Sequence, residues 1–135
     1  MADKIRFELV SPEELLISQE VEMVVIPGED GDFGVLPGHA LFASLVRPGL
    51  IDIYNDDVIS DQIFVAGGVS EVSQEACTVL TEEAIKLDEI ERTTVEERIS
   101  ENEKAINLAN PDEDTSRFEK DLATSRVLLE CLDRR

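Results

Sequence analysis

The residues with the clearest chemical potential lie in one stretch, residues 24–49, which contains five glycines and three prolines. Three carboxylates, Glu29, Asp30 and Asp32, are followed there by the only histidine of the chain, His39. Carboxylates and histidine are the side chains of acid–base catalysis and of metal binding. Because glycine permits positive φ and proline fixes φ, so many glycines and prolines predict a loop of defined shape that makes contacts.

Neither catalysis nor metal binding is favoured for this loop. A nucleophilic site needs a histidine held among convergent partners, whereas His39 lies in a Pro-Gly-His-Ala turn beside aliphatic runs. The carboxylates lack the spacing and the terminal glutamate of an EF-hand. We therefore expect no catalytic residue, metal or cofactor, and interpret the loop as a contact for a cationic partner or as a plain solvated loop. A small β-sandwich enzyme is a rival, which turnover abolished by His39→Ala would reveal.

The net charge of the chain limits the kinds of partner that the chain can bind. Its 31 acidic and 12 basic side chains give a formal net charge of −19. Nucleic acid and anionic lipid both need cationic surfaces, so the sequence argues against either as a partner and favours a basic protein surface. Residues 1–87 carry 4 basic and 17 acidic side chains, and residues 88–135 carry 8 and 14, which indicates two parts with different surroundings.

No part of the sequence predicts insertion into a membrane. No apolar run approaches the roughly 20 residues that are needed to span a bilayer. The first residues begin a strand pattern directly and resemble neither a signal peptide nor a transit peptide. Cys77 and Cys131 lie far apart in the sequence. We expect both to be free thiols, as in an intracellular protein. We expect a soluble, intracellular protein.

Residues 1–87 are predicted to form a β-sandwich or flattened barrel. Period-two alternation marks a first strand at residues 5–9, and short extended runs follow up to residue 80, separated by turn signals. Residues 62–66 are apolar on both alternations, as in a strand buried on both faces. Gly67 and Gly68 predict a bulge or tight bend. Many short strands without intervening helices argue against βαβ units.

The last part of the chain, residues 88–135, is predicted to form an antiparallel hairpin of two amphipathic helices, which makes the fold class α+β. A capping box within residues 93–97 starts the first helix, and the Asn-Pro pair at 110–111 ends it. Asn102 and Ser125 lie inside the apolar stripes, which predicts thin packing. The hairpin is expected to dock on the sandwich or to act as a mobile, regulatory arm.

Basic residues gather on the second predicted helix. Residues 115–135 carry 5 basic against 4 acidic side chains, unlike the rest of the chain. This excess would let the helix approach an acidic surface that repels the sandwich. The candidate contact residues are Arg117, Lys120 and Arg126, with Arg134 and Arg135 at the end.

Three motifs in this order resemble the epsilon subunit of F-type ATP synthases, whose mitochondrial equivalent is called delta. They are Gly-Asp-Phe-Gly-Val-Leu-Pro-Gly-His-Ala at 31–40, Val-Arg-Pro-Gly at 46–49, and Val-Ala-Gly-Gly-Val-Ser-Glu-Val at 65–72. The helical hairpin follows them, so the resemblance covers essentially the whole chain. One departure is Leu41, because family members commonly have proline at that position.

The resemblance implies a non-catalytic rotor subunit that couples the c-ring to the gamma subunit during ATP synthesis. Asp32 would face the polar loops of the c-ring, with Glu29, Asp30 and His39 nearby. The hairpin would lie folded or extend along gamma, where it reaches the alpha and beta subunits, so that a regulatory inhibitor of ATP hydrolysis is the alternative function. The implied location is the cytoplasmic face of the bacterial inner membrane, peripheral to the bilayer.

Binding of ATP by the hairpin is not expected. Some family members bind ATP through an Ile/Leu-Asp-x-x-Arg-Ala motif, for which Asp88 and Arg92 are the candidates here. Aligning Asp88 puts Glu91 where arginine belongs, and aligning Arg92 puts Glu89 where aspartate belongs. A glutamate in place of the arginine would repel a phosphate group.

Overall fold

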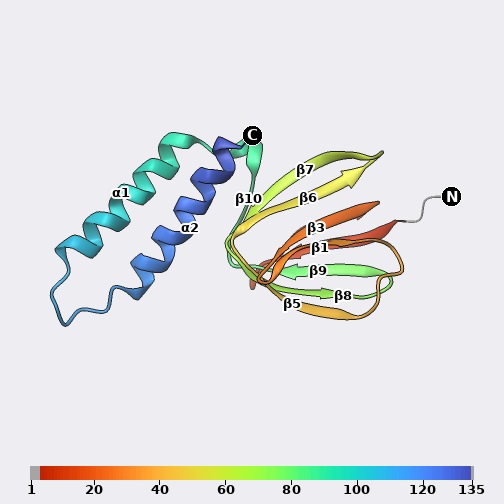
Figure 1. The fold of residues 1–135 in the computed structure, drawn as a ribbon, viewed down its shortest axis with the longest axis horizontal. Coiled ribbons are helices and arrows are strands. Elements are labelled where there is room, and N and C mark those ends of the chain that lie inside the picture. Colours follow the sequence, from red (N-terminus) through yellow and green to blue (C-terminus); the bar gives the residue numbers. More distant parts are fainter. Residues whose placement is uncertain (1–3, 135) are drawn as a thin grey trace. The chain divides into compact units, whose positions relative to one another are not determined.

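The computed structural model describes residues 4–134 and divides the chain into two compact units, residues 1–86 and residues 87–135 (Figure 1). The division falls one residue before the predicted boundary. The first unit contains only strands, and the second contains a short 3₁₀ helix and two long helices.

The strands of the first unit follow the predicted order, with two additions, at residues 31–35 and at residues 84–86. They are β1 (Ile5–Val10), β2 (Leu15–Val21), β3 (Met23–Gly28), β4 (Gly31–Val35), β5 (Phe42–Val46), β6 (Gly49–Asn55), β7 (Val58–Val65), β8 (Gly68–Val72), β9 (Ala76–Leu80) and β10 (Ala84–Lys86). The helices of the second unit are η1 (Leu87–Glu89), α1 (Arg92–Leu108) and α2 (Ser116–Asp133).

The ten strands form one curled sheet that closes over an aliphatic core. The path runs β10-β7-β6-β3-β5-β8-β9-β1-β2, and β4 pairs with β3 beside it. Figure 1 shows β7, β6 and β3 in one layer, with β9, β8 and β5 in the other. Alternate residues of β1, namely Ile5, Phe7 and Leu9, are buried in the core, as the period-two pattern predicts. The predicted β-sandwich is confirmed.

The β7 strand and the bend that follows it also agree with the sequence. Ile63, Phe64 and Val65 are all buried, as expected for a strand covered on both faces. Beyond β7, Gly67 and Gly68 both have positive φ, of 104° and 148°. A Cβ on Gly68 would lie 1.9 Å from the carbonyl oxygen of Leu80, so only glycine permits this close approach of β8 to β9.

The prediction of one continuous loop between the strands that end near residue 25 and begin at residue 41 is wrong in its middle. Residues 31–35 form β4, which pairs antiparallel with β3 from Gly28↔Gly31 to Val24↔Val35. The two strands make a hairpin with a two-residue turn, Glu29-Asp30. Two glycines within five residues hide this strand from a propensity argument, because glycine is depleted in strands.

The helical hairpin is confirmed, but its first helix begins earlier than predicted. The N-cap of α1 is Glu91, so the capping box within residues 93–97 is wrong. The helix follows η1 directly, with Ile90 N–H donating to the Leu87 carbonyl, and the two threonines therefore lie inside the first turn. The N-cap of α2 is Thr115.

Candidate protein-contact site

The acidic loop residues lie at the turn of the β3–β4 hairpin. Glu29 and Asp30 form the turn itself and are exposed, and Asp32 follows on β4 with its side chain 60% exposed. We call Glu29, Asp30 and Asp32 the acidic turn. The Glu29 N–H donates to the Leu45 carbonyl at 2.9 Å, which ties the turn to the end of β5. The structure thus brings all three predicted carboxylates together at one end of the β3–β4 hairpin, two on its turn and one on β4.

Arg47 holds this turn and was not singled out from the sequence. Its guanidinium donates to the Gly28 carbonyl at 2.6 Å and to Asp32 Oδ1 at 2.5 Å, and its backbone N–H donates to the Pro27 carbonyl at 2.9 Å. One side chain therefore joins both strands of the hairpin across the turn. Because Arg47 neutralises Asp32 in part, Glu29 and Asp30 are the carboxylates left to attract a partner.

Replacing Arg47 with alanine is expected to loosen the acidic turn without unfolding the sandwich. The exchange of the Glu29 amide should accelerate about tenfold, because its hydrogen bond to Leu45 loses the neighbouring clamp, whereas exposed ion pairs contribute only about 0–1 kcal/mol to folding. Amide hydrogen exchange followed by NMR measures this. Arg47→Lys is the matched control, since lysine cannot donate to both acceptors in the same planar geometry. Unchanged exchange in Arg47→Ala would contradict the clamp.

His39 lies away from the acidic turn, although both were predicted to contact one partner. The strand β4 separates them, and its five residues span roughly 13 Å at the usual rise per residue. Nδ1 of His39 lies 2.7 Å from the Ala40 carbonyl, and its ring centroid lies 6.2 Å from that of Phe42. The structure therefore does not bring His39 together with Glu29, Asp30 and Asp32, and a contact of all four with one partner stays a prediction.

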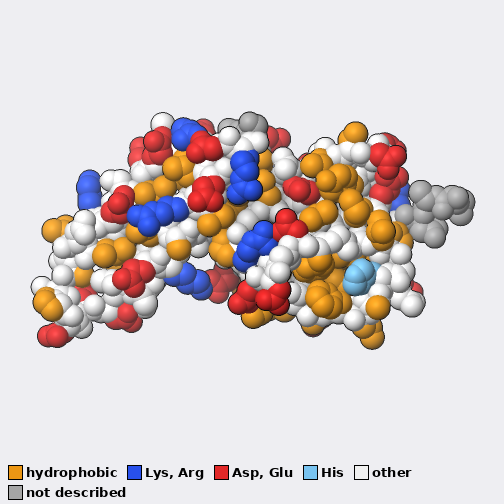
Figure 2. Space-filling model, viewed as in Figure 1, with side chains coloured by type: hydrophobic (Ala, Val, Ile, Leu, Met, Phe, Trp, Pro, Cys, Tyr) orange, Lys and Arg blue, Asp and Glu red, His pale blue; other side chains and the backbone are white. Residues whose placement is uncertain are grey.

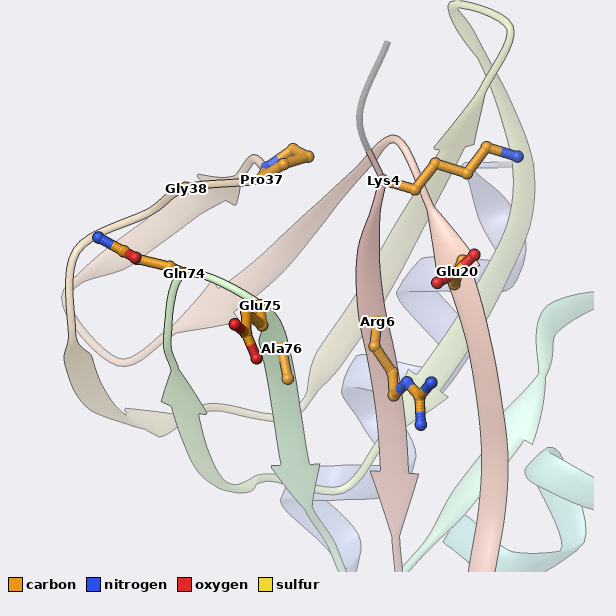
Figure 3. Close-up of a pocket in the computed structure, with 8 residues that line it drawn as sticks. All are labelled: Lys4, Arg6, Glu20, Pro37, Gly38, Gln74, Glu75 and Ala76. Atoms are coloured by element: carbon orange, nitrogen blue, oxygen red, sulfur yellow. The ribbon is translucent and has the colours of Figure 1, made fainter.

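An open cleft of about 750 Å³ lies at the end of the sandwich where β1 begins. Figure 3 shows Lys4, Arg6 and Glu20 on one side of it, and Gln74 and Glu75 on the other, with Pro37 and Gly38 at its rim. The lining carries two cations and two carboxylates, so the charge of this cleft favours neither an anionic nor a cationic ligand.

The basic residues predicted to contact a partner do not share one face of α2. Arg117 and Lys120 are three positions apart, but Arg126 is nine positions from Arg117, which turns it by about 180° around the axis. Arg117 lies over the Phe118 ring at 5.0 Å, and Arg126 lies 3.9 Å from Glu103 of α1. Figure 2 shows that the Lys and Arg side chains visible in that view lie mostly over the helical unit. Their role as partner contacts stays a prediction.

A polar network joins the two helices of the hairpin. Asp121 of α2 accepts two hydrogen bonds from the Arg98 guanidinium, at 2.5 and 3.0 Å, and one from Asn102 Nδ2 at 2.5 Å. The Ser125 hydroxyl donates to the Asp121 carbonyl at 2.7 Å. Asn102 and Ser125, the polar residues of the predicted stripes, are thus buried and bonded. The Arg98 hydrogen bonds hold the pKa of the Asp121 carboxyl below its usual value, against the opposing effect of burial.

This network predicts that acid loosens the hairpin. Because the pKa of Asp121 is lower in the folded state, its stabilisation is present above the unfolded-state pKa of about 3.9 and is lost as the pH falls through the folded value. Asp121→Asn should therefore destabilise the helices by about 1 kcal/mol at neutral pH, in the range of partly exposed pairs, and should flatten their acid transition. Far-ultraviolet circular dichroism of the full chain measures both. An acid transition identical in the two proteins would contradict this role.

The two candidates for nucleotide binding lie at the start of the second unit. Asp88 is exposed on η1, and Arg92, the first residue of α1, forms an ion pair with Asp133 at the end of α2. Arg92 is therefore already engaged by a carboxylate of the hairpin, as is Arg98. A phosphate group would have to displace these partners.

The remaining chemical groups are buried or do not converge. Cys77 and Cys131 are both free and buried, and burial raises the pKa of the Cys77 thiol to about 12. Within residues 4–134, no three His, Cys, Asp or Glu side chains gather closely enough to hold a metal ion. In that same range, neither long helix has the length and apolar character needed to cross a bilayer.

Comparison with known proteins defines the class to which this fold and acidic turn belong. Residues 4–87 match the family model described as the ATP synthase Delta/Epsilon chain, beta-sandwich domain. This match covers the first unit from residue 4 onward, including the acidic turn and Arg47.

Full-length relatives extend the match to the hairpin. The chain is 49% identical to the ATP synthase epsilon chain of Rhodospirillum centenum, over 98% of this chain and 94% of that one. It is 45% identical to the ATP synthase epsilon chain of Rhodospirillum rubrum, over 98% and 96%. The chain belongs to the ATP synthase epsilon chains, and the resemblance stated from its motifs is confirmed.

Solved structures support the fold independently of sequence. A chain in the cryo-EM structure of the Euglena gracilis mitochondrial ATP synthase, OSCP/F1/c-ring, superposes with a TM-score of 0.73 at 22% identity, over 97% of this chain and 80% of that one. A chain in the central stalk/c-ring structure of the Tetrahymena thermophila enzyme superposes with a TM-score of 0.66 at 12% identity, over 96% and 97%. At these identities the likeness concerns the fold.

Proposed function

We propose that this chain is a non-catalytic rotor subunit of the ATP synthase and couples rotation of the c-ring to the gamma subunit. The observation that carries the proposal is the acidic turn, whose carboxylates are presented on a two-residue turn that Arg47 clamps. A rotor contact must resist slipping under torque, so a fixed backbone with charges at defined positions suits it better than a flexible acidic loop.

The partner of the acidic turn is a basic surface, for which the polar loops of the c-ring are the candidate. The first unit carries 4 basic against 17 acidic side chains, and Arg47, one of the four, is paired with Asp32. Opposite charges across an interface speed encounter and fix its register. Glu29 and Asp30 are the residues that make this contact, and Asp32 acts mainly by holding Arg47.

The sandwich transmits torque as a stiff body. Its core is built of close-packed aliphatic side chains from both layers, and close packing gives protein interiors low compressibility. The chain makes and breaks no covalent bond in this role and needs no cofactor. It works at the cytoplasmic face of the bacterial inner membrane, held there by the complex.

Removal of the second unit tests coupling against regulation. If the chain mainly couples, synthase complexes with the chain ending at Lys86 should retain proton-driven ATP synthesis, because the acidic turn and sandwich lie within residues 1–86. The measurement is ATP synthesis and ATP hydrolysis by the same reconstituted vesicles. Loss of synthesis despite normal assembly would contradict the proposal.

The regulatory alternative gives a different result in the same vesicles. The hairpin is a separate compact unit with its own polar network, which is the observation that favours it as an inhibitory arm. If inhibition is its main task, truncation should raise hydrolysis several-fold, while full-length chains that carry Asp121→Asn show a smaller rise. Equal hydrolysis in all three complexes would exclude the regulatory role.

A further inference from the structure

The turn of the β3–β4 hairpin contains the one place in the sequence where an aspartate or asparagine is followed by glycine, Asp30-Gly31. At such a pair the side-chain carboxyl can react with the backbone nitrogen of the next residue, because the ring that closes has five members. A side chain on that next residue crowds the approach, whereas glycine has none. The pair is therefore the position of this chain where ring closure meets the least local hindrance.

The surroundings of this pair leave room for the reaction. Asp30 and Gly31 are both exposed. Gly31 has φ of 135°, and a Cβ built on it would meet no atom within 4 Å, so no neighbouring group fills the space beside its backbone. Water therefore has free access to the bond between the two residues.

Hydrogen bonds next to the pair restrain the same backbone. The Arg47 guanidinium donates to the Gly28 carbonyl at 2.6 Å, directly before the turn, and the Glu29 N–H donates to the end of β5 at 2.9 Å. Gly28 also pairs with Gly31 in the register that closes the hairpin. Ring closure must turn the Gly31 nitrogen toward the Asp30 side chain, so the turn has to open before the reaction occurs.

We propose that Asp30-Gly31 is a site of spontaneous isomerisation, where aspartate converts to isoaspartate when the hydrogen bonds of the turn open. The Gly31 nitrogen forms a bond to the side-chain carboxyl carbon of Asp30, and the amide proton and the carboxyl hydroxyl leave as one water molecule. A second water molecule then opens this succinimide ring at the original backbone carbonyl, so that the chain continues through the former side chain. One water is lost and one is regained, and the step needs no oxidant, reductant or other reactant.

Isoaspartate displaces the acidic turn without changing its charge. The backbone gains one carbon atom between residues 30 and 31, and the carboxylate moves onto the Cα atom. A two-residue turn has no slack for an added atom, so the Gly28↔Gly31 pair must shift. This consequence rests on the proposed function, because that function makes the acidic turn a contact whose charges need defined positions.

Ageing of the full-length chain in neutral buffer tests the reaction. Proteolytic peptides, separated by isomer-resolving chromatography and labelled by an isoaspartyl methyltransferase, locate the product. Isoaspartate should accumulate at residue 30 and not at Asp112-Glu113, which is also exposed in a turn but has a side chain on its second residue. Arg47→Ala should speed the reaction about tenfold, as expected for exchange of the Glu29 amide, because both need the opened turn. No isoaspartate at residue 30, as much at residue 112, or equal rates in the two proteins would overturn the inference.

Rebinding to synthase complexes stripped of this chain tests the effect on the acidic turn. The isoaspartyl form, separated from aged wild-type chain, should have a Kd about tenfold higher than the unmodified form from the same sample, because the displaced carboxylate no longer matches its partner. Repair by the methyltransferase, which returns aspartate, should restore the Kd. Equal Kd values for the two forms would overturn the inference that isomerisation displaces the contact. Failure of the unmodified chain itself to rebind would instead contradict the proposed rotor function.

Discussion

Exchanging both Glu29 and Asp30 for lysine is expected to raise the Kd of this chain for the stripped synthase about a hundredfold, which equals about 2.7 kcal/mol. Both side chains are exposed on a turn whose backbone is fixed by Arg47 and by the hydrogen bond to Leu45. Replacing attraction by repulsion at a complementary contact costs several kcal/mol and slows association. The rate and equilibrium constants of rebinding, measured at two salt concentrations, report this effect.

The control for this prediction must change the charge equally at another place. Asp112→Lys with Glu113→Lys does so in the exposed turn between α1 and α2, where two acidic residues are also adjacent. This double variant should rebind within about twofold of the wild type, and both doubles should melt near the wild-type temperature because exposed charges contribute little to stability. If both double variants rebound equally weakly, net charge, and not the acidic turn, would govern binding.

Gly68→Ala is expected to destabilise the sandwich by about 2–5 kcal/mol. The residue has φ of 148°, and a Cβ would lie 1.9 Å from the Leu80 carbonyl oxygen, so β8 and β9 would have to separate. The estimate combines about 1–2 kcal/mol for an L-residue at positive φ with about 1–3 kcal/mol for overpacking. Urea unfolding of the sandwich, followed by amide signals of its core strands, measures this loss.

Substitutions at two other glycines distinguish the cost of backbone strain from the cost of the steric clash. Gly31 also has positive φ, 135°, but a Cβ there would meet no atom within 4 Å, so Gly31→Ala should cost only about 1–2 kcal/mol of strain. Gly34 has no positive φ, and a Cβ there would make only an ordinary contact, 3.7 Å from the Met23 sulfur, so Gly34→Ala should be nearly neutral. If Gly68→Ala were no more destabilising than Gly31→Ala, the close approach of β8 to β9 would be contradicted.

Patterns of residues close together in the sequence were sufficient to predict the β-sandwich and the helical hairpin. Alternation of Ile5, Phe7 and Leu9 and the double glycine at 67–68 depend on neighbours in sequence, and the structure confirms what they predict. The strand β4 was missed because its own local sequence argues against a strand. Its glycines lower strand propensity, and only the pairing with β3 stabilises it.

The candidate site was predicted in its residue types but not in its geometry. The family resemblance implied that His39 lies near Asp32, yet an extended strand carries the two residues apart. Arg47 was missed because its 15-residue separation from Asp32 becomes a contact only through sheet register. The signal that could have found Arg47 is its rarity, because residues 1–87 carry only 4 basic side chains against 17 acidic ones.

The helical unit illustrates a third kind of failure. One apolar stripe was predicted on α2, whereas the structure buries Leu128 and Cys131 as well as Leu122 and Leu132. A single-face analysis cannot find a helix that is buried on two adjoining faces. The Arg98–Asp121 pair was missed because it crosses between helices, where spacing along the chain is uninformative.

The central claim is that the acidic turn is the contact with the ring, and one measurement tests it directly. A photo-crosslinker at position 30 of the full-length chain, activated in the intact, membrane-bound synthase, reports the neighbour of the turn. Cross-linking to a polar loop of the c-subunit, abolished when Glu29 is also changed to lysine, is the result that we predict. Efficient cross-linking to any other subunit, or none in complexes that retain this chain, would contradict the claim.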